Sequence, residues 1–166
     1  MVMTVNAGEI PADHWTQDMD VGGGRIIGEG CHFIDLLRYL ANSCIVDVQA
    51  RAMDSSCKDS VSILLSFANG SIGTVNYLAN GNKGFPKERL EVFCGGGIAQ
   101  VDNFRSLKAF GWPGLKSQRL WRQDKGQSNC TRAFVDAIEK GDSSALIPVD
   151  ELLEVAHACF DVVDQI

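Results

Sequence analysis

The sequence has no cluster of positive charge and no long apolar run. Its 15 basic residues are outnumbered by 21 acidic ones and never form a dense stretch, for a formal net charge of −6. Nucleic acids and anionic membrane surfaces attract clustered cations, so neither is an expected partner. No segment is apolar enough to span a bilayer, and the first residues lack the pattern of a signal peptide. We therefore expect a cytoplasmic protein.

Patterns of metal ligands, disulfides and hydrolase nucleophiles are also missing. The six cysteines form no C-x-x-C pair and do not cluster, which predicts reduced thiols. The side chains of His14, Glu29, Cys31 and His32 are possible ligand types without a recognisable spacing, so we expect no metal. No G-x-S-x-G motif supports a serine hydrolase.

Two glycine runs, 22–24 and 95–97, do not match a nucleotide-binding motif. The first misses the G-x-G-x-x-G spacing, does not follow a strand directly, and precedes no βαβ unit. The chain is therefore expected to contain no Rossmann domain of its own. The residues favour close backbone packing at 22–24 and a hairpin turn at 95–97, with contact between 22–24 and a ligand as the alternative.

Length and periodicity predict one α+β domain over residues 1–166. With 45% hydrophobic and 22% charged residues, the composition is that of an ordinary globular chain. A short strand at 1–6 precedes a loop. Alternating apolar residues then predict further strands at 46–51, 61–67, 72–78, 90–94, 98–101, 107–110 and 115–122. Asn69-Gly70 suits a tight hairpin because both residues tolerate positive φ.

Three helices are expected. The first begins near Gly28, extends to Ala41, and has the apolar positions Phe33, Ile34, Leu37, Leu40 and Ala41. The second is capped by Ser128 and ended by Gly141, with an apolar side of Cys130, Phe134, Ala137 and Ile138. The third follows Pro148 and is predicted to bury Leu152, Leu153, Ala156, Phe160 and Val163. Strands joined by hairpins, with helices grouped apart, indicate a largely antiparallel open sheet with helices on one face.

His32 is the principal candidate for chemistry. It is expected in the first turn of the first helix, three residues after Glu29, so that the carboxylate could fix the imidazole tautomer. A helix N-terminus disfavours added positive charge, which would keep the ring neutral and able to accept a proton. The alternative is a buried histidine with satisfied hydrogen bonds. Trp15 could stack on a sugar or cover the core.

The segment GGGRIIGEGCHFIDLLRYL (22–40) resembles the signature that opens the C-terminal domain of the glucose-fructose oxidoreductase/inositol dehydrogenase (Gfo/Idh/MocA) family. The resemblance continues in order through SILLSFANGSIGTVNY (62–77), RLEVFCGGGIAQVDN (89–103) and IPVDELLEVAHACFDVV (147–163). NAGEIPADHW (6–15) is similar to the segment that leads in from the family's nucleotide-binding domain. The resemblance as a whole implies a fold like that of the C-terminal domain of dihydrodipicolinate reductase, within a larger oxidoreductase.

The resemblance also implies a site. His32 matches the family histidine beside the substrate and nicotinamide, and Glu29 is the candidate partner because Gly28 occupies the usual aspartate position. Implied substrate-binding positions are Asn6, Trp15, Gly24, Arg25 and Gly28, for a secondary alcohol of a sugar, sugar derivative or cyclitol. NAD or NADP would be held mainly by an N-terminal domain absent from this sequence. The outer sheet face would form a homodimer or homotetramer. A non-catalytic ligand-binding or assembly domain of the same fold is the alternative.

Overall fold

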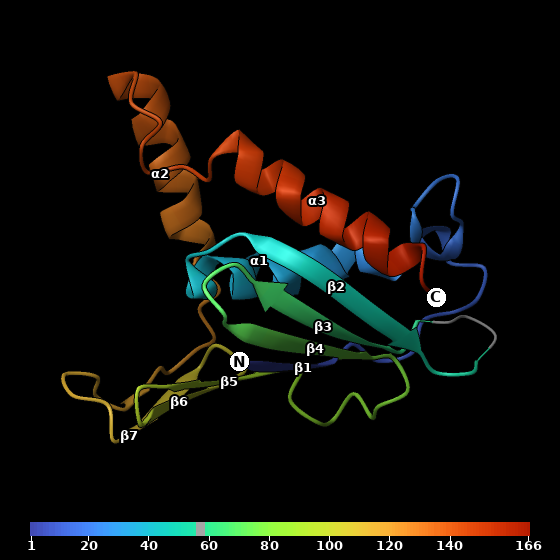
Figure 1. Cartoon of the computed structure of the whole chain (residues 1–166), viewed down its shortest axis with the longest axis horizontal. Coiled ribbons are helices and arrows are strands. Elements are labelled where there is room, and N and C mark those ends of the chain that lie inside the picture. The colour runs from blue at the N-terminus through green and yellow to red at the C-terminus, as the bar shows by residue number, and fades with distance from the viewer. Residues whose placement is uncertain (56–58) are drawn as a thin grey trace.

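The computed structural model describes residues 1–55 and 59–166 (Figure 1). The strands are β1 (Val2–Asn6), β2 (Ile45–Ala52), β3 (Val61–Phe67), β4 (Ile72–Leu78), β5 (Glu88–Cys94), β6 (Gly97–Asp102), β7 (Ser106–Phe110) and β8 (Gln118–Arg119). The α-helices are α1 (Cys31–Ala41), α2 (Gln127–Lys140) and α3 (Val149–Val163). A 3₁₀ turn, η1 (Trp15–Gln17), and a π-helical turn, η2 (Ile26–Gly30), precede α1.

The eight strands form one sheet in the order β2-β3-β4-β1-β5-β6-β7-β8. Strand β1 runs parallel to β4, and the other neighbouring pairs are antiparallel. The Asn69-Gly70 turn joins β3 to β4, and Gly70 has a φ of +83°. Because β1 is inserted between two groups of hairpin-linked strands, it lies in the middle of the sheet, and the loop after it leaves from one end of this central strand.

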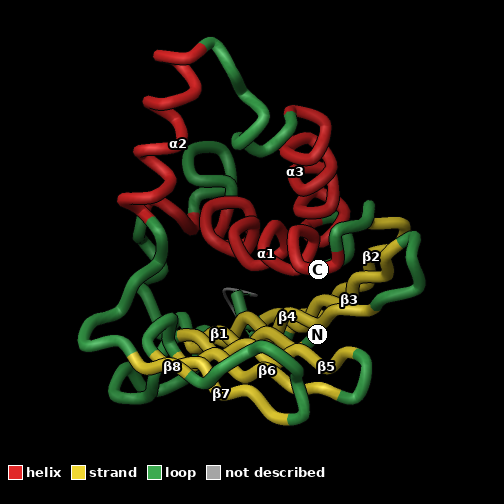
Figure 2. Tube along the Cα trace, turned by 90° about the vertical axis from the view of Figure 1, so that its left-hand side faces the viewer, coloured by secondary structure: helices red, strands yellow, loops and turns green. Residues whose placement is uncertain are grey.

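Helices α1 and α3 cover one face of the sheet, whereas α2 projects away at one end (Figures 1 and 2). Alternate strand residues meet the helix layer because successive strand side chains point to opposite faces. The core is formed by Met3, Val5, Phe33, Ile34, Leu37, Val61, Ile63, Leu65, Phe67, Val75 and Val162, with others around them. The predicted α+β fold, with a largely antiparallel open sheet and helices on one face, is confirmed.

The first helix begins earlier than predicted. Right-handed helical backbone starts at Arg25, and the η2 turn leads without interruption into α1. His32 therefore lies seven residues further along the helix, not in its first turn. The argument that a helix N-terminus keeps this imidazole neutral does not apply, because the dipole effect is confined to the first turn.

The buried face of α3 also differs from the prediction. Val155, Ala158, Cys159 and Val162 face the core, whereas Leu152, Leu153 and Phe160 are about half exposed. The helix has apolar residues on two sides, and the side with smaller residues lies against α1 and β2.

The second helix and the last strand depart from the prediction as well. Gly126, not Ser128, precedes α2, and none of its residues is buried. The predicted strand at 115–122 shortens to the two residues of β8, after the turn at Pro113-Gly114.

Five of the cysteines, Cys31, Cys44, Cys94, Cys130 and Cys159, are free thiols, and Cys57 lies outside the described residues. Within residues 1–55 and 59–166, no helix combines the length and apolar character needed to cross a membrane.

Candidate functional site

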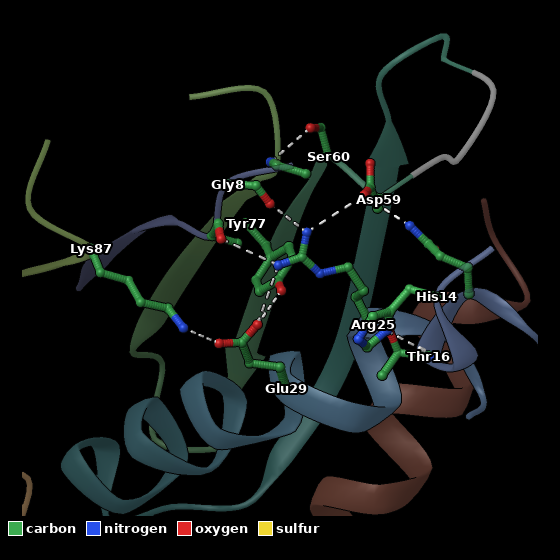
Figure 3. A network of polar contacts seen from close by, with 12 residues as sticks. Gly8, His14, Thr16, Arg25, Glu29, Asp59, Ser60, Tyr77 and Lys87 are labelled. Carbon is green, nitrogen blue, oxygen red and sulfur yellow. Dashed lines mark hydrogen bonds and ion pairs between the residues drawn. The ribbon is translucent and has the colours of Figure 1, made fainter. Parts of the chain in front are cut away.

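Arg25 lies at the centre of a polar cluster between the helix layer and one end of the sheet (Figure 3). Its side chain is 7% exposed, and Nη1 donates to the carbonyl oxygen of Gly8 at 2.7 Å. The carboxylates of Asp59 and Glu29 each lie 3.5 Å from the guanidinium, and its central carbon stands 5.2 Å from the centre of the Tyr77 ring. Arg25 thus connects the loop after β1, the helix start and the sheet.

Glu29 lies one helical turn after Arg25 and points toward the sheet (Figure 3). The Tyr77 hydroxyl donates to Oε2 of this carboxylate, and the Lys87 ammonium donates to Oε1. Burial alone would raise the pKa of Glu29. The hydrogen bonds from Lys87 and Tyr77, with the charges of Lys87 and Arg25, outweigh burial and hold the pKa below its usual value. Glu29 is therefore an anion at neutral pH.

Tyr77 is fully buried on β4, where its ring packs in the core beneath the cluster. Burial and the hydrogen bond to the Glu29 carboxylate raise the pKa of the phenol far above its usual value. The hydroxyl consequently stays protonated and acts as a fixed donor. Its role is to hold Glu29 in place.

Asn6, at the end of β1, fixes the loop between β4 and β5. Its side-chain amide donates to the carbonyl oxygens of Asn82 at 2.8 Å and Phe85 at 3.2 Å. Its backbone N–H donates to the carbonyl oxygen of Lys87 at 2.7 Å. The amide nitrogen of Asn6 is thus engaged within the protein, and the segment that bears Lys87 is held close to β1.

The predicted pair of Glu29 and His32 is not formed among the described residues. Glu29 turns to the sheet, whereas His32 is exposed and lines a cavity of about 410 Å³ between α1 and α3. The ring nitrogen Nδ1 of His32 lies 3.9 Å from the Cys31 sulfur. Apolar side chains dominate the cavity wall, which includes Ile27, Ile147, Leu152, Val155, Ala156 and Phe160.

Asp35 is the carboxylate that shares this cavity with His32. Burial and the nearby Glu151 raise the pKa of Asp35, while His32 and Arg38 act in the opposite direction. Burial also raises the pKa of Cys159, another lining residue, to about 12, so this thiol is protonated at neutral pH. The imidazole therefore has a carboxyl neighbour one turn along its helix, but on the side away from Glu29.

The glycines of segment 22–28 have different surroundings. A Cβ at Gly22 would lie 2.5 Å from the carbonyl oxygen of Trp15, so this residue permits close packing of the chain on itself. Gly24 and Arg25 line a second cavity of about 460 Å³, together with Gln17, Asp59 and Val163. A Cβ at Gly28 would meet nothing nearer than 4.0 Å.

Trp15 lies at the surface of the loop after β1, 61% exposed and beside His14. In the described part of the chain, the Trp15 ring makes no hydrogen bond with the Arg25 cluster, but Gln17, at the other end of the same turn, does reach it. Gln17 donates to Asp59 at 3.3 Å and so connects η1 to the cluster. Of the predicted site residues, Asn6, Arg25 and Glu29 gather at one end of the sheet, while His32 lies apart.

The arrangement of the described residues also bears on metal and cofactor binding. Within residues 1–55 and 59–166, no group of three or more histidine, cysteine, aspartate or glutamate side chains could hold a metal ion. The connection between the parallel strands β1 and β4 contains α1 followed by β2 and β3, so it is not the direct βαβ unit of a dinucleotide-binding fold. The described residues therefore do not fit an NAD(P) site.

Sequence analysis missed three members of the cluster, namely Asp59, Tyr77 and Lys87. Tyr77 could have been identified from its sequence position, because it alternates with Val75 on the buried face of a strand and a buried hydroxyl needs a hydrogen-bond partner. Asp59 and Lys87 lie in loops without periodicity, and no local pattern marks them.

The open sheet, its layer of helices and the polar cluster at one end define an α+β domain with one uncovered sheet face. Residues 2–100 match the sequence model of the GFO/IDH/MocA C-terminal domain. The chain belongs to the GFO/IDH/MocA family and represents its C-terminal domain. Comparison with curated proteins finds no match.

Solved structures share the fold over 99% of this chain. They include the UDP-N-acetylglucosamine 3-dehydrogenase of Acidithiobacillus ferrooxidans (19% identity, TM-score 0.74, 54% of that chain). The aldose-aldose oxidoreductase of Caulobacter crescentus, complexed with glycerol, is similar (18% identity, TM-score 0.75, 52% of that chain). A third similar structure is GenD2 of gentamicin A biosynthesis, in complex with NAD (22% identity, TM-score 0.68, 51% of that chain). At these identities the likeness concerns the fold, and the chain spans about half the length of each structure.

Proposed function

We propose that this chain is the substrate-binding part of an NAD(P)-dependent oxidoreductase acting on a secondary alcohol of a sugar, sugar derivative or cyclitol. The proposal rests on the polar cluster of Arg25, Glu29 and Lys87, which lies beside the loop after β1 in a member of the GFO/IDH/MocA family. Two structures with the same fold are, by name, a UDP-sugar dehydrogenase and an aldose oxidoreductase. Their names support the substrate class proposed here.

His32 is proposed as the acid/base residue. An imidazole titrates near neutral pH, so it can take the proton of an alcohol and return it. The wall of its cavity is mostly apolar, so a substrate bound there would displace water from the imidazole. Asp35, rather than Glu29, is the carboxylate placed to influence the ring.

The remaining predicted positions receive binding or positioning roles. Gly24 and Arg25 line the larger cavity, and Gly28 leaves open space on the helix surface. Trp15 presents an exposed ring on which a sugar could stack. Asn6 holds the β4–β5 loop and therefore the position of Lys87.

The cofactor is proposed to be NAD or NADP, bound outside the described residues. GenD2 has been solved with NAD and supports this class of cofactor. Because the described residues do not fit a dinucleotide, the contribution proposed for this chain is to bind and orient the alcohol and to accept its proton.

The uncovered sheet face is proposed as the surface of a homodimer or homotetramer. Its side chains include the paired Arg89 and Glu91 at 2.9 Å, and the exposed Phe93 and Phe110 lie toward one end. Sedimentation of the protein as a monomer at high concentration would contradict this. The free thiols of the described cysteines support a reducing, cytoplasmic location.

A non-catalytic ligand-binding or assembly role is the second candidate. It is favoured by Gly28 at the position where the resemblance places an aspartate, and by the engagement of Glu29 with Tyr77 and Lys87. In that case the cluster would bind a ligand or stabilise the domain without turnover.

The mass and the activity of the native polypeptide distinguish the catalytic from the non-catalytic function. Its mass in the source cell should exceed 18.0 kDa by at least a domain of about 100–150 residues. The full chain should then oxidise sugars or cyclitols with NAD or NADP, and His32→Asn should lower kcat/KM by about 10²–10⁴-fold.

His157→Asn, an exposed histidine on α3, is the matched control and should leave kcat/KM unchanged. A native mass of 18 kDa, or full activity of His32→Asn, would remove the catalytic proposal.

A further inference from the structure

Lys87 is the member of the polar cluster best placed to touch a ligand. Its side chain is 41% exposed, whereas that of Glu29 is 27% and that of Arg25 is 7% exposed. Tyr77 is fully buried. The ammonium of Lys87 is therefore where this network reaches the surface.

The network holds that ammonium in one position. Glu29 accepts from Lys87 through Oε1, and Tyr77 and Arg25 restrain the same carboxylate at Oε2. The backbone of Lys87 is fixed through Asn6, which also pins the preceding loop at Asn82 and Phe85. A lysine on a surface loop ordinarily loses side-chain entropy when it binds a ligand, and here much of that loss has already occurred on folding.

The donors of Lys87 are not exhausted by Glu29. An ammonium has three N–H donors and no acceptor. Among residues 1–55 and 59–166, the Glu29 carboxylate is the one side-chain acceptor that the Lys87 ammonium contacts. The remaining N–H groups suit an oxygen acceptor of a ligand.

The charge of the cluster favours a neutral ligand. Two cations, Arg25 and Lys87, are balanced by two carboxylates, Glu29 and Asp59. Among these four side chains, a phosphate or carboxylate ligand would meet no net positive charge. A hydroxyl or carbonyl oxygen requires none, because it accepts a hydrogen bond from the ammonium without bringing a charge.

We propose that Lys87 binds substrate by donating to a hydroxyl or carbonyl oxygen of a neutral polyhydroxylated molecule, and that Glu29 is its positioning residue. This assignment rests on the proposed function for its reaction, but the binding step can be measured without turnover. Glu29 thereby serves the lysine and not the imidazole of His32.

The test measures binding and turnover separately in the full native polypeptide, with the neutral probes myo-inositol, D-glucose and N-acetyl-D-glucosamine. Calorimetric titration gives Kd, and steady-state assays with NAD and NADP give KM and kcat. Lys87→Met should weaken binding of the preferred probe about 10- to 100-fold and raise KM in parallel, since a charged donor is lost. Inorganic phosphate should not compete with that probe.

The controls separate binding from stability. Lys116→Met removes an exposed lysine in the loop between β7 and β8 and should leave Kd unchanged. Glu29→Gln should weaken binding by less than Lys87→Met, because the ammonium remains but is less well held. Melting temperatures should change little for Lys87→Met, since a half-exposed ion pair contributes little to folding.

Unchanged Kd in Lys87→Met would overturn the inference, as would a wild-type protein that binds none of the three probes. A lowered melting temperature with unchanged Kd would show a purely structural ion pair and would also overturn it. Lys87-dependent binding in a protein without any turnover would support the inference and refute the proposed oxidoreductase function.

Discussion

Replacing Arg25 with methionine should strongly destabilise the fold. The guanidinium is 7% exposed, donates to the Gly8 carbonyl at 2.7 Å, and neutralises Asp59 and Glu29 at 3.5 Å each. Methionine approximates the volume of the aliphatic part but leaves a carbonyl and two partly buried carboxylates without their donor. Removing one partner of a buried ion pair typically costs about 3–5 kcal/mol.

That loss is large against the total stability of a domain, which is typically about 5–15 kcal/mol. At this chain length each kcal/mol corresponds to roughly 2–4 °C, so the melting temperature should fall by roughly 6–20 °C. Urea unfolding followed by far-ultraviolet circular dichroism measures the free energy directly, and Arg122→Met, at an exposed site, should change it by less than about 0.5 kcal/mol.

A triple variant tests whether unpaired carboxylates cause this loss of stability. If unpaired carboxylates produce the loss, then Arg25→Met combined with Glu29→Gln and Asp59→Asn should recover part of it, because removing all members of a buried ion cluster is often nearly neutral. A loss below about 1 kcal/mol in Arg25→Met, or no recovery in the triple variant, would refute the electrostatic reasoning.

Three further predictions concern helix packing, glycines and pH. Val162→Ala should cost about 2 kcal/mol and Leu153→Ala under about 0.5, because only Val162 is buried; equal losses in urea would contradict the assigned face of α3. Gly28→Ala should stabilise by about 0.5–1 kcal/mol, whereas Gly22→Ala should destabilise because its Cβ would lie 2.5 Å from a backbone oxygen, as thermal melts would show. The pKa of Glu29 is depressed in the folded state, so its contribution is present above its usual value near 4.5 and is lost as pH falls through the folded pKa. Glu29→Gln should accordingly be less sensitive than the wild type to acidification below about pH 5, and parallel curves would exclude this linkage.

Local patterns were sufficient to predict the central hairpin of the sheet and most of the first helix, although not the start of that helix or the extent of β8. Alternation over β3 and β4 and the Asn69-Gly70 turn depend only on neighbouring residues, and the structure has all of them. The face of α3 could not be read in this way. That helix is apolar on both sides, and the choice between them depends on how closely α1 and β2 approach.

The site was less accessible to sequence reasoning because its contacts are distant along the chain. Glu29 meets Tyr77 across 48 positions and Lys87 across 58. Helical spacing could show that Glu29 and His32 lie three residues apart. It could not show that the sheet offers the carboxylate a hydroxyl and an ammonium, while the imidazole lines the cavity between α1 and α3.

Gly28 determines whether a carboxylate precedes His32 by one helical turn. The resemblance places an aspartate at this position, one turn before His32, yet a Cβ at Gly28 would meet nothing nearer than 4.0 Å. Packing therefore does not exclude a carboxylate here, and its absence is not a steric necessity. The nearest carboxylate along the chain, Glu29, is turned by about 100° and binds Lys87 instead. The helix thus lacks a carboxylate directed at the imidazole from the preceding turn and has one that holds an ammonium at the sheet, so the proposed recognition at Lys87 and the proposed proton transfer at His32 should be separable by mutation.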